Sequence, residues 1–248
     1  MERLWKAIFA AVRIEDGKDA VQAWREHCQR LANRAEILTK YQFRSLHYTN
    51  SLGTNLTVEL PEGHVWGAGD ELAGTGVRFV ANMPTEEVFT APKRDAVNGE
   101  LYASMPLVLN GNIVKDIHFT LKDGRITEIH ASQGEEILRA AVNTDEGAHY
   151  LGEVALVPYD SPIRESGLLF FNTLFDENAS CHFAFGEAYP TCIEGGAEMS
   201  EQELLAHGLN ASSNTHVDFM VGTRDLQIVG TTHDGTQVEI FCNGNFVF

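Results

Sequence analysis

Two short segments of this 248-residue sequence place ionisable side chains in apolar surroundings. In NTHVDFMVG, His216 and Asp218 occupy alternate positions, and alternate side chains of a β-strand point to the same face. In YLGEVALVP, Glu153 is the lone charge in a run that is typical of a strand buried on both faces. A buried carboxylate needs a compensating charge. A bound cation would provide it at either segment.

Two further segments add carboxylates and a histidine of the same kind. NMPTEEVFTAP contains Glu86 and Glu87, and FDENASCHFAFGEAYP contains Glu177 and His182. If both candidate histidines ligate as neutral imidazoles, two divalent cations would balance the four negative charges of Glu87, Glu153, Glu177 and Asp218. Carboxylate and imidazole ligands without a thiolate suit zinc, cobalt, manganese or magnesium. Two such ions about 4 Å apart can convert a bridging water into a hydroxide nucleophile near neutral pH.

Each of these residues also has a simpler interpretation. A single buried glutamate is more often an ion-pair partner, the His-x-Asp pair could face solvent, and Glu86 and Glu87 could lie on a solvated turn. The set as a whole favours a metal site more than its members do. We expect structural roles for the other eight histidines, His27 among them.

Composition narrows the classes of function. Thirty-five acidic and eighteen basic residues give a net charge of -17, which disfavours nucleic acid and anionic membranes as partners. The N-terminal segment is typical of an amphipathic helix rather than of a signal peptide, and no apolar run is long enough to span a membrane. The four cysteines form no CxxC pair. These features predict a cytoplasmic protein.

The apolar pattern changes once along the chain. Residues 1–42 have the three- to four-residue period of two helices, and short alternating runs typical of strands follow. Asp123-Gly124 and Asp234-Gly235 predict hairpins with two-residue turns, whereas 135–142 and 200–207 are expected to be helical. The pattern predicts an α+β fold with a mainly antiparallel, curved sheet and flanking helices. We expect one domain over 1–248, with 1–42 as its helical lead-in.

Four segments also resemble a known family: TEEVFTAP, LGEVALVP, NTLFDENASCHFAFGEAY and THVDFMVG are similar to segments of the metallo-aminopeptidases of the aminopeptidase T and aminopeptidase S (PepS) type. The resemblance implies a cytoplasmic exopeptidase that removes N-terminal residues from peptides with two divalent cations. It places metal ligands at Glu87, Glu153, Glu177, His182, His216 and Asp218, and a catalytic tyrosine at Tyr189. Members of that family are longer, with a preceding α/β domain, and are homodimers in full-length form, so this chain is expected to correspond to their C-terminal metal-binding part.

Two catalytic roles complete the hypothesis. The phenol of Tyr189 could donate a hydrogen bond to the oxyanion that forms as the peptide carbonyl becomes tetrahedral. Glu86 is the candidate general base, which requires a bend in the chain because neighbouring strand residues face opposite ways. The alternatives are a metal-stabilised, non-catalytic fragment or binding module and a two-metal phosphoesterase. The last is disfavoured because the ligand motifs contain no arginine or lysine to bind a phosphate.

Overall fold

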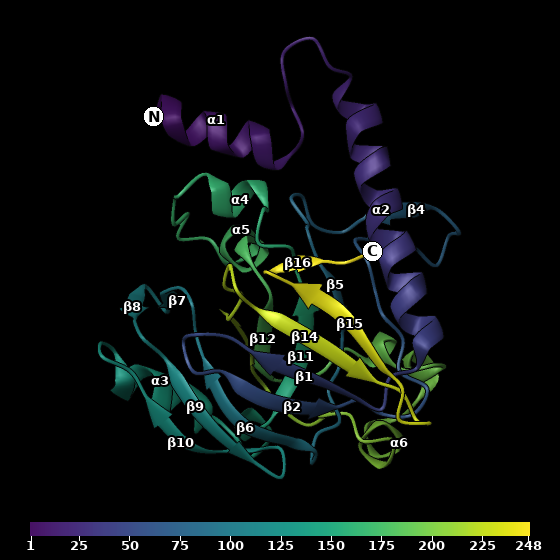
Figure 1. Cartoon of the computed structure of the whole chain (residues 1–248), viewed down its shortest axis with the longest axis vertical. Helices are drawn as coiled ribbons and strands as arrows, with labels where there is room; N and C mark the ends of the chain where they lie inside the picture. Colours follow the sequence, from purple (N-terminus) through teal and green to yellow (C-terminus); the bar gives the residue numbers. More distant parts are fainter.

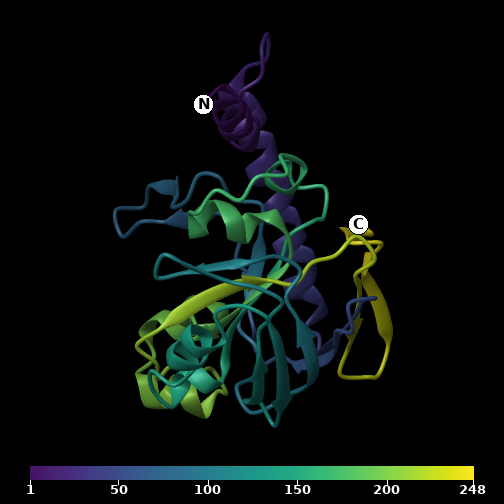
Figure 2. The ribbon, with the colours of Figure 1, turned by 90° about the vertical axis from the view of Figure 1, so that its left-hand side faces the viewer.

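The computed structural model describes residues 1–248, and it begins with the two expected helices. Helix α1 spans Glu2–Ala11 and α2 spans Ala20–Tyr41. The side chain of Asp19 caps α2 by accepting hydrogen bonds from the backbone N–H groups of its first turn. Helix α1, the turn after it and the first part of α2 project from one end of the molecule (Figures 1 and 2).

The remaining chain forms two main antiparallel sheets. The larger sheet has eight strands in the order β10-β9-β6-β2-β1-β14-β15-β16. Along the chain these are β1 Ser45–Thr49, β2 Asn55–Glu59, β6 Val97–Tyr102, β9 His118–Lys122, β10 Arg125–His130, β14 Gln227–Thr231, β15 Gln237–Cys242 and β16 Asn245–Phe246. The smaller sheet has the order β13-β12-β11-β5, formed by β5 Val88–Thr90, β11 Leu151–Leu156, β12 His182–Gly186 and β13 His216–Met220. The predicted α+β class is confirmed, and the sheets are open rather than closed into a barrel.

The core lies between these two sheets, and the smaller one is seen behind the larger in Figure 1. Aromatic rings join them: Tyr48 of β1 lies 5.2 Å from Phe183 of β12, and Phe119 of β9 lies 5.2 Å from Phe219 of β13. Because Phe183 and Phe219 point toward the larger sheet, the residues that alternate with them point away from it. The smaller sheet therefore has an outer face built from a separate set of side chains.

Both predicted hairpins are present, but only one has the predicted turn. Lys122 pairs with Arg125, so Asp123 and Gly124 form a two-residue turn in which both have positive φ. In the other hairpin Thr231 pairs with Gln237, which leaves a loop of five residues. The prediction of a two-residue turn there was wrong. The carboxylate of Asp234 organises the longer loop by accepting hydrogen bonds from Thr232 and Thr236.

Short elements fill the connections between the strands. The expected helices are α3 Glu135–Val142 and α6 Glu201–Ala206, and Ser200 and Glu203 form the capping box of α6. The others are α4 Pro162–Glu165, α5 Thr173–Asp176, the 3-10 helices η1 Gly147–His149, η2 Glu177–Ala179, η3 Pro190–Cys192 and η4 Gly196–Glu198, and the strand pairs β3 Asp70–Leu72 with β4 Arg78–Val80 and β7 Leu107–Leu109 with β8 Asn112–Val114.

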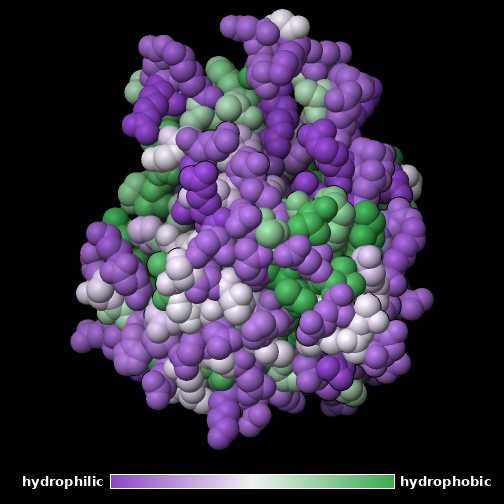
Figure 3. All heavy atoms as spheres, in the orientation of Figure 1, coloured by the Kyte–Doolittle hydropathy of each residue, from purple (hydrophilic) through white to green (hydrophobic).

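The surface in Figure 3 is mainly hydrophilic, which agrees with the strongly acidic composition. None of the helices has both the length and the apolar character that crossing a lipid bilayer would require.

Candidate metal centre

The outer face of the smaller sheet brings the predicted ligands together through its strand register. Ala184 of β12 pairs with Glu153 of β11 on one side and with Asp218 of β13 on the other, so the three side chains form a row on one face. His182 and His216 lie two residues before Ala184 and Asp218 on their own strands, and they share that face. The small side chain of Ala184 separates two carboxylates without filling the space between them.

Glu87 reaches the same face from the edge strand. Phe89 of β5 pairs with Ala155, which lies two residues after Glu153, and Glu87 lies two residues before Phe89. Its Oε2 atom is 3.0 Å from Nε2 of His182, and Nε2 of His182 is 3.3 Å from Oε1 of Glu153. One donor atom from each of the three residues lies within 4.8 Å of the other two, which is a spacing that a single cation can bridge.

A second trio shares Glu153 with the first. Nε2 of His216 lies 3.5 Å from Oε2 of Glu153 and 3.3 Å from Oδ1 of Asp218. Donor atoms of these three residues also lie within 4.8 Å of one another. The two oxygens of Glu153 therefore face different histidines, as in a carboxylate that bridges two cations.

Backbone carbonyls orient both histidines. Nδ1 of His182 lies 3.2 Å from the carbonyl oxygen of Ser180, and Nδ1 of His216 lies 2.7 Å from that of Glu187. A carbonyl can only accept, so each Nδ1 donates its proton and Nε2 is the nitrogen that faces the cluster. This arrangement is common for metal-binding histidines, whose other ring nitrogen donates to a carbonyl or carboxylate.

The pKa values of the side chains in the cluster depend on the charges of their neighbours as well as on burial. Burial alone would lower the pKa of His216, but the hydrogen bond with Asp218 and the charges of Asp218 and Glu153 raise it to about 9. The pKa of buried His182 is likewise held well above its usual value by Glu153 and Glu87, against the effect of burial. Burial raises the pKa of Glu153, and its contact with His182 opposes that change. Without cations, protons on the histidines thus neutralise part of the carboxylate charge.

Glu177 enters the centre from η2 and belongs to neither trio. Its side chain is buried, and burial is the main reason why its pKa is raised to about 8, with further increases from the charges of Asp218 and Glu87. These charges act on Glu177 because it lies beside the two trios.

The cluster forms part of the wall of a cavity of about 710 Å³. Glu177 and four of the five residues of the trios line this cavity, as does Tyr189. Tyr189 is 51% exposed, and its ring lies 5.2 Å from that of His216. Burial and the charges of Glu153 and Asp218 raise the pKa of Tyr189 to about 12, so the phenol keeps its proton at neutral pH and can donate a hydrogen bond.

Glu86 takes a different direction from Glu87 and does not line the cavity. Its two carboxylate oxygens lie 2.6 and 2.7 Å from Nη1 and Nη2 of Arg13. Burial raises the pKa of Glu86, whereas Arg13 lowers it. To act as the general base, as the sequence suggested, Glu86 would have to leave this bidentate ion pair.

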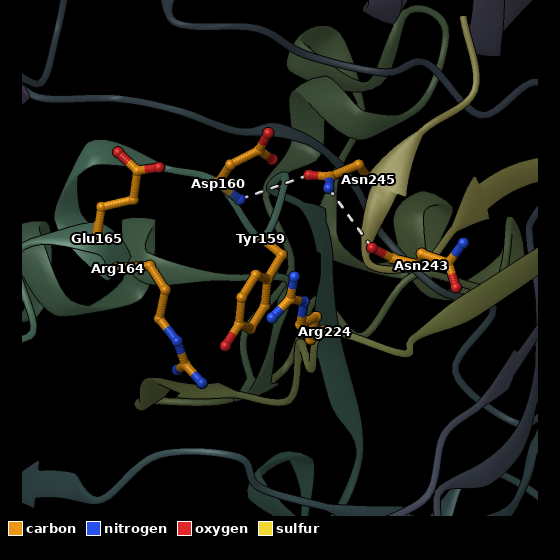
Figure 4. A pocket seen from close by; sticks show the side chains of 7 residues that line it. All are labelled: Tyr159, Asp160, Arg164, Glu165, Arg224, Asn243 and Asn245. Atoms are coloured by element: carbon orange, nitrogen blue, oxygen red, sulfur yellow. Dashed lines mark hydrogen bonds between the residues drawn. The ribbon is translucent and has the colours of Figure 1, made fainter.

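A second hollow, of about 430 Å³, lies elsewhere on the surface (Figure 4). Its lining includes Arg164 and Arg224 together with Asp160 and Glu165, so its formal charges cancel. It contains no histidine or cysteine. This hollow lacks the donor set of the first cavity, which leaves the outer face of the smaller sheet as the candidate centre.

The residues at the centre fit a divalent cation. Nε2 of His182 and Oε2 of Glu87 are buried, and neither makes a hydrogen bond of regular geometry although they lie 3.0 Å apart. Buried polar atoms without such a partner are uncommon in native proteins. A donor set of carboxylates and imidazoles suits zinc, cobalt or manganese.

Comparison with known proteins identifies the family of this chain. The sequence model of the thermophilic metalloprotease (M29) family matches residues 1–246. The chain belongs to that family. It is 51% identical to aminopeptidase AmpS of Bacillus subtilis (strain 168) over 245 residues, and 44% identical to aminopeptidase T of Thermus aquaticus over 247 residues. These matches cover 99% and 100% of the chain but 59% of each relative, so this M29 chain spans about three fifths of the length of its curated relatives.

Two solved structures share the fold. Wild-type AmpT from Thermus thermophilus has a TM-score of 0.91 and 43% identity to this M29 chain, covering 100% of it and 59% of the AmpT chain. A 2,5-dihydroxypyridine dioxygenase from Pseudomonas putida KT2440 has a TM-score of 0.56 at 18% identity. The second similarity concerns the fold alone.

Some residues around the centre of the M29 chain were not recognised from the sequence. Asn178 and Ala184 lie within the segment FDENASCHFAFGEAYP but were given no role, Arg13 lies outside every segment singled out, and His27 was assigned a structural role. The alternation of side chains along a strand would have indicated Ala184, because it lies two residues after His182 and therefore on the same face. No sequence signal indicates that Arg13 lies next to Glu86, which is 73 positions further along the chain.

Proposed function

We propose that this M29 chain carries the catalytic centre of an aminopeptidase, which removes the N-terminal residue of peptides with two divalent cations. The observation that carries the proposal is the shared position of Glu153, whose two oxygens belong to two different trios of donor atoms. One trio, with Glu87 and His182, would hold the first cation, and the other, with His216 and Asp218, would hold the second. Glu177 would complete the coordination at this centre.

Two cations held there would lower the pKa of a bound water and polarise the peptide carbonyl. The chain's own residues orient the substrate. Six carboxylates line the cavity and no lysine or arginine does. Two divalent cations would balance four of them, and the Glu71 carboxylate outside the centre would attract the positively charged amino terminus of a peptide. Tyr189 would donate its phenolic proton to the developing oxyanion, a contact that is strongest in the transition state.

The lining also favours a peptide over a phosphate ester as the substrate. Enzymes that act on phosphoryl groups stabilise the transferring oxygens with arginine, lysine or cations. Beyond the four carboxylates of the proposed centre, Glu71 adds negative charge to the wall of the cavity, whereas the charge of Asp70 is paired with Arg78. An anionic substrate would therefore be repelled by Glu71, a carboxylate outside the proposed centre.

The proposal is tested by adding Co²⁺, Zn²⁺ or Mn²⁺ to the metal-free chain and measuring hydrolysis of leucine p-nitroanilide and of p-nitrophenyl phosphate. The expected result is metal-dependent release of p-nitroaniline alone. Phosphate ester hydrolysis alone would favour the phosphoesterase alternative. Metal binding that raises the melting temperature without any hydrolysis would favour a metal-stabilised, non-catalytic role for this part of the chain.

In each relative, 41% of the chain lies outside the part that matches this chain. For this reason the same assay on a full-length relative provides the positive control. A homodimer of the full-length form is part of the proposal, and sedimentation of that form beside this chain measures it.

A further inference from the structure

The end of helix α1 has an unusual residue. Arg13 has φ of 62°, and the backbone N–H groups of Arg13 and Ile14 donate to the carbonyls of Ala10 and Phe9. This is the Schellman pattern that ends many helices, in which glycine is the usual residue at the left-handed position. An arginine is disfavoured there, and unfavourable backbone conformations persist where the surrounding structure requires them. The side chain of Arg13 supplies such a requirement.

That side chain makes a fork-shaped contact with Glu86. Nη1 and Nη2 donate to the two carboxylate oxygens at 2.6 and 2.7 Å, and Nη1 also donates to the carbonyl of Ala11 at 2.8 Å. The side chains of Arg13 and Glu86 are 17% and 4% exposed. A bidentate, largely buried pair fixes both direction and distance, which a lysine could not reproduce.

His27 of α2 holds the residue before Glu86. Its Nε2 lies 2.6 Å from the carbonyl oxygen of Thr85, and its Nδ1 lies 3.1 Å from Nη2 of Arg13. Both contacts are satisfied when Nε2 carries the proton and Nδ1 accepts from the guanidinium. Arg13 after α1 and His27 within α2 therefore contact two successive residues of the segment that leads to Glu87.

A third contact comes from the opposite side. The backbone N–H of Glu86 donates to Oδ1 of Asn178 at 2.7 Å, and Asn178 is buried and adjacent to Glu177. The carbonyl of Thr85, the N–H group of Glu86 and the side chain of Glu86 are thus held by three separate partners. Glu87 is the next residue, and its carboxylate belongs to the first trio.

We propose that Arg13, together with His27, is a positioning residue for Glu87: by fixing Thr85 and Glu86, it sets the place of the Glu87 carboxylate in the trio with Glu153 and His182. This inference rests on the metal centre of the proposed function. It also gives Glu86 a role outside the reaction, as the anchor through which Arg13 acts.

The test measures Co²⁺ binding at each trio separately, by equilibrium dialysis and by the visible absorption of bound Co²⁺. Asp218→Asn leaves only the trio that contains Glu87, and Glu87→Gln leaves only the trio that contains His216. In the Asp218→Asn chain, Arg13→Met is expected to weaken Co²⁺ binding by about 10- to 100-fold, the usual effect of losing a group that orients a ligand. In the Glu87→Gln chain the same substitution should leave binding unchanged.

Arg13→Lys keeps the positive charge but not the bidentate contact, so it should weaken Co²⁺ binding at the first trio only, and by less than Arg13→Met does. It replaces Arg13→Met in the test if that variant does not fold. Arg139→Met, which breaks an exposed ion pair with Glu135, is the matched control and should affect neither trio. Equal weakening of both trios, or none at the first, would overturn the inference. Normal Co²⁺ binding without peptide hydrolysis would overturn the proposed function and leave the inference intact, whereas an unsubstituted chain that binds no Co²⁺ would overturn both.

Discussion

Ala184 lies directly opposite Glu153 in the ladder between β12 and β11, so its methyl group lies beside the carboxylate that the two trios share. It is also opposite Asp218 in the neighbouring ladder and is fully buried. A position between two carboxylates on one face of a sheet is tolerated by a side chain that occupies little volume. A substitution of Ala184 therefore tests the arrangement without removing any donor atom of the two trios.

Ala184→Leu is expected to abolish binding of the second cation, because the added atoms would occupy the space between Glu153 and Asp218. Overpacking should also lower the free energy of unfolding by about 1–3 kcal/mol. Isothermal titration with Co²⁺ and urea unfolding measure the two effects. Ala35→Leu in α2 controls for overpacking of a buried alanine, and it should lower stability while two cations still bind. Two cations bound to Ala184→Leu would contradict the arrangement.

Glu153→Gln keeps the size of the side chain but removes the charge that both trios use. We expect the number of bound cations to fall from two to at most one and the rate of peptide hydrolysis to fall about 100-fold or more, since a cation contributes several kcal/mol to the transition state. Metal analysis after dialysis measures the stoichiometry. Glu128→Gln on the exposed side of β10 is the control and should bind as the unsubstituted chain does. Retention of both cations by Glu153→Gln would remove its bridging role.

Tyr189→Phe should lower kcat by about 10²–10³-fold with little change in metal content, which is the usual effect of losing one oxyanion donor. The pKa of about 12 keeps the phenol protonated across the neutral range, so the loss should not depend on pH between 6 and 9. Steady-state kinetics at several pH values measure this. Tyr150→Phe provides a control at a tyrosine outside the cavity. An unchanged kcat would exclude the role.

Cation affinity should rise with pH. In the metal-free chain the pKa values of Glu177 and His216 are raised to about 8 and about 9, so both side chains carry protons at neutral pH that a cation must displace. We expect tighter Co²⁺ binding and less proton release per cation as the pH rises from 6.5 toward 9. Calorimetric titration in buffers of different ionisation enthalpy measures the protons released. Affinity that falls over this range would contradict the assignment.

The stability of the metal-free chain should change in the opposite direction. The raised pKa of His216 stabilises the folded state fully below pH 6.5, and this contribution is lost as the pH rises through about 9. The raised pKa of Glu177 means that the folded state also binds this proton more tightly than the unfolded state, so stability falls between pH 4.5 and about 8. The melting temperature in EDTA should decrease over these ranges, and His216→Gln should flatten the upper part. A melting temperature that rises from pH 6.5 to 9 would contradict both shifts.

The sequence was most informative where local pattern decides structure. The helical period before residue 42, the Asp123-Gly124 turn and the Ser200 capping box each depend on residues that are neighbours in the chain. The order of the eight-stranded sheet could not be predicted in the same way, because β1 pairs with β14 across some 180 positions. The five-residue loop at Asp234 was missed because side-chain hydrogen bonds to Thr232 and Thr236 favour it over the tighter turn.

For the candidate site, the sequence indicated the residue types but not their surroundings. His216 and Asp218 could be placed on one face because strand alternation is a local property, and the structure brings both to the cavity. Glu86 was expected near the cations because it adjoins Glu87. The structure turns it toward Arg13 instead, since a contact between the N-terminal corner and residue 86 has no local signature. Such long-range contacts decide which of two adjacent glutamates enters the cavity.

The order of the candidate ligands along the chain has a consequence for folding. The centre takes one or more residues from each of β11, β12 and β13 and from the segments before β5 and β12, which span 132 positions of the sequence. No local fragment can hold two ions in this way, so tight capture should come only after the last strand of the smaller sheet has joined its neighbours. Bound ions should then lower the rate of unfolding and leave the rate of folding nearly unchanged.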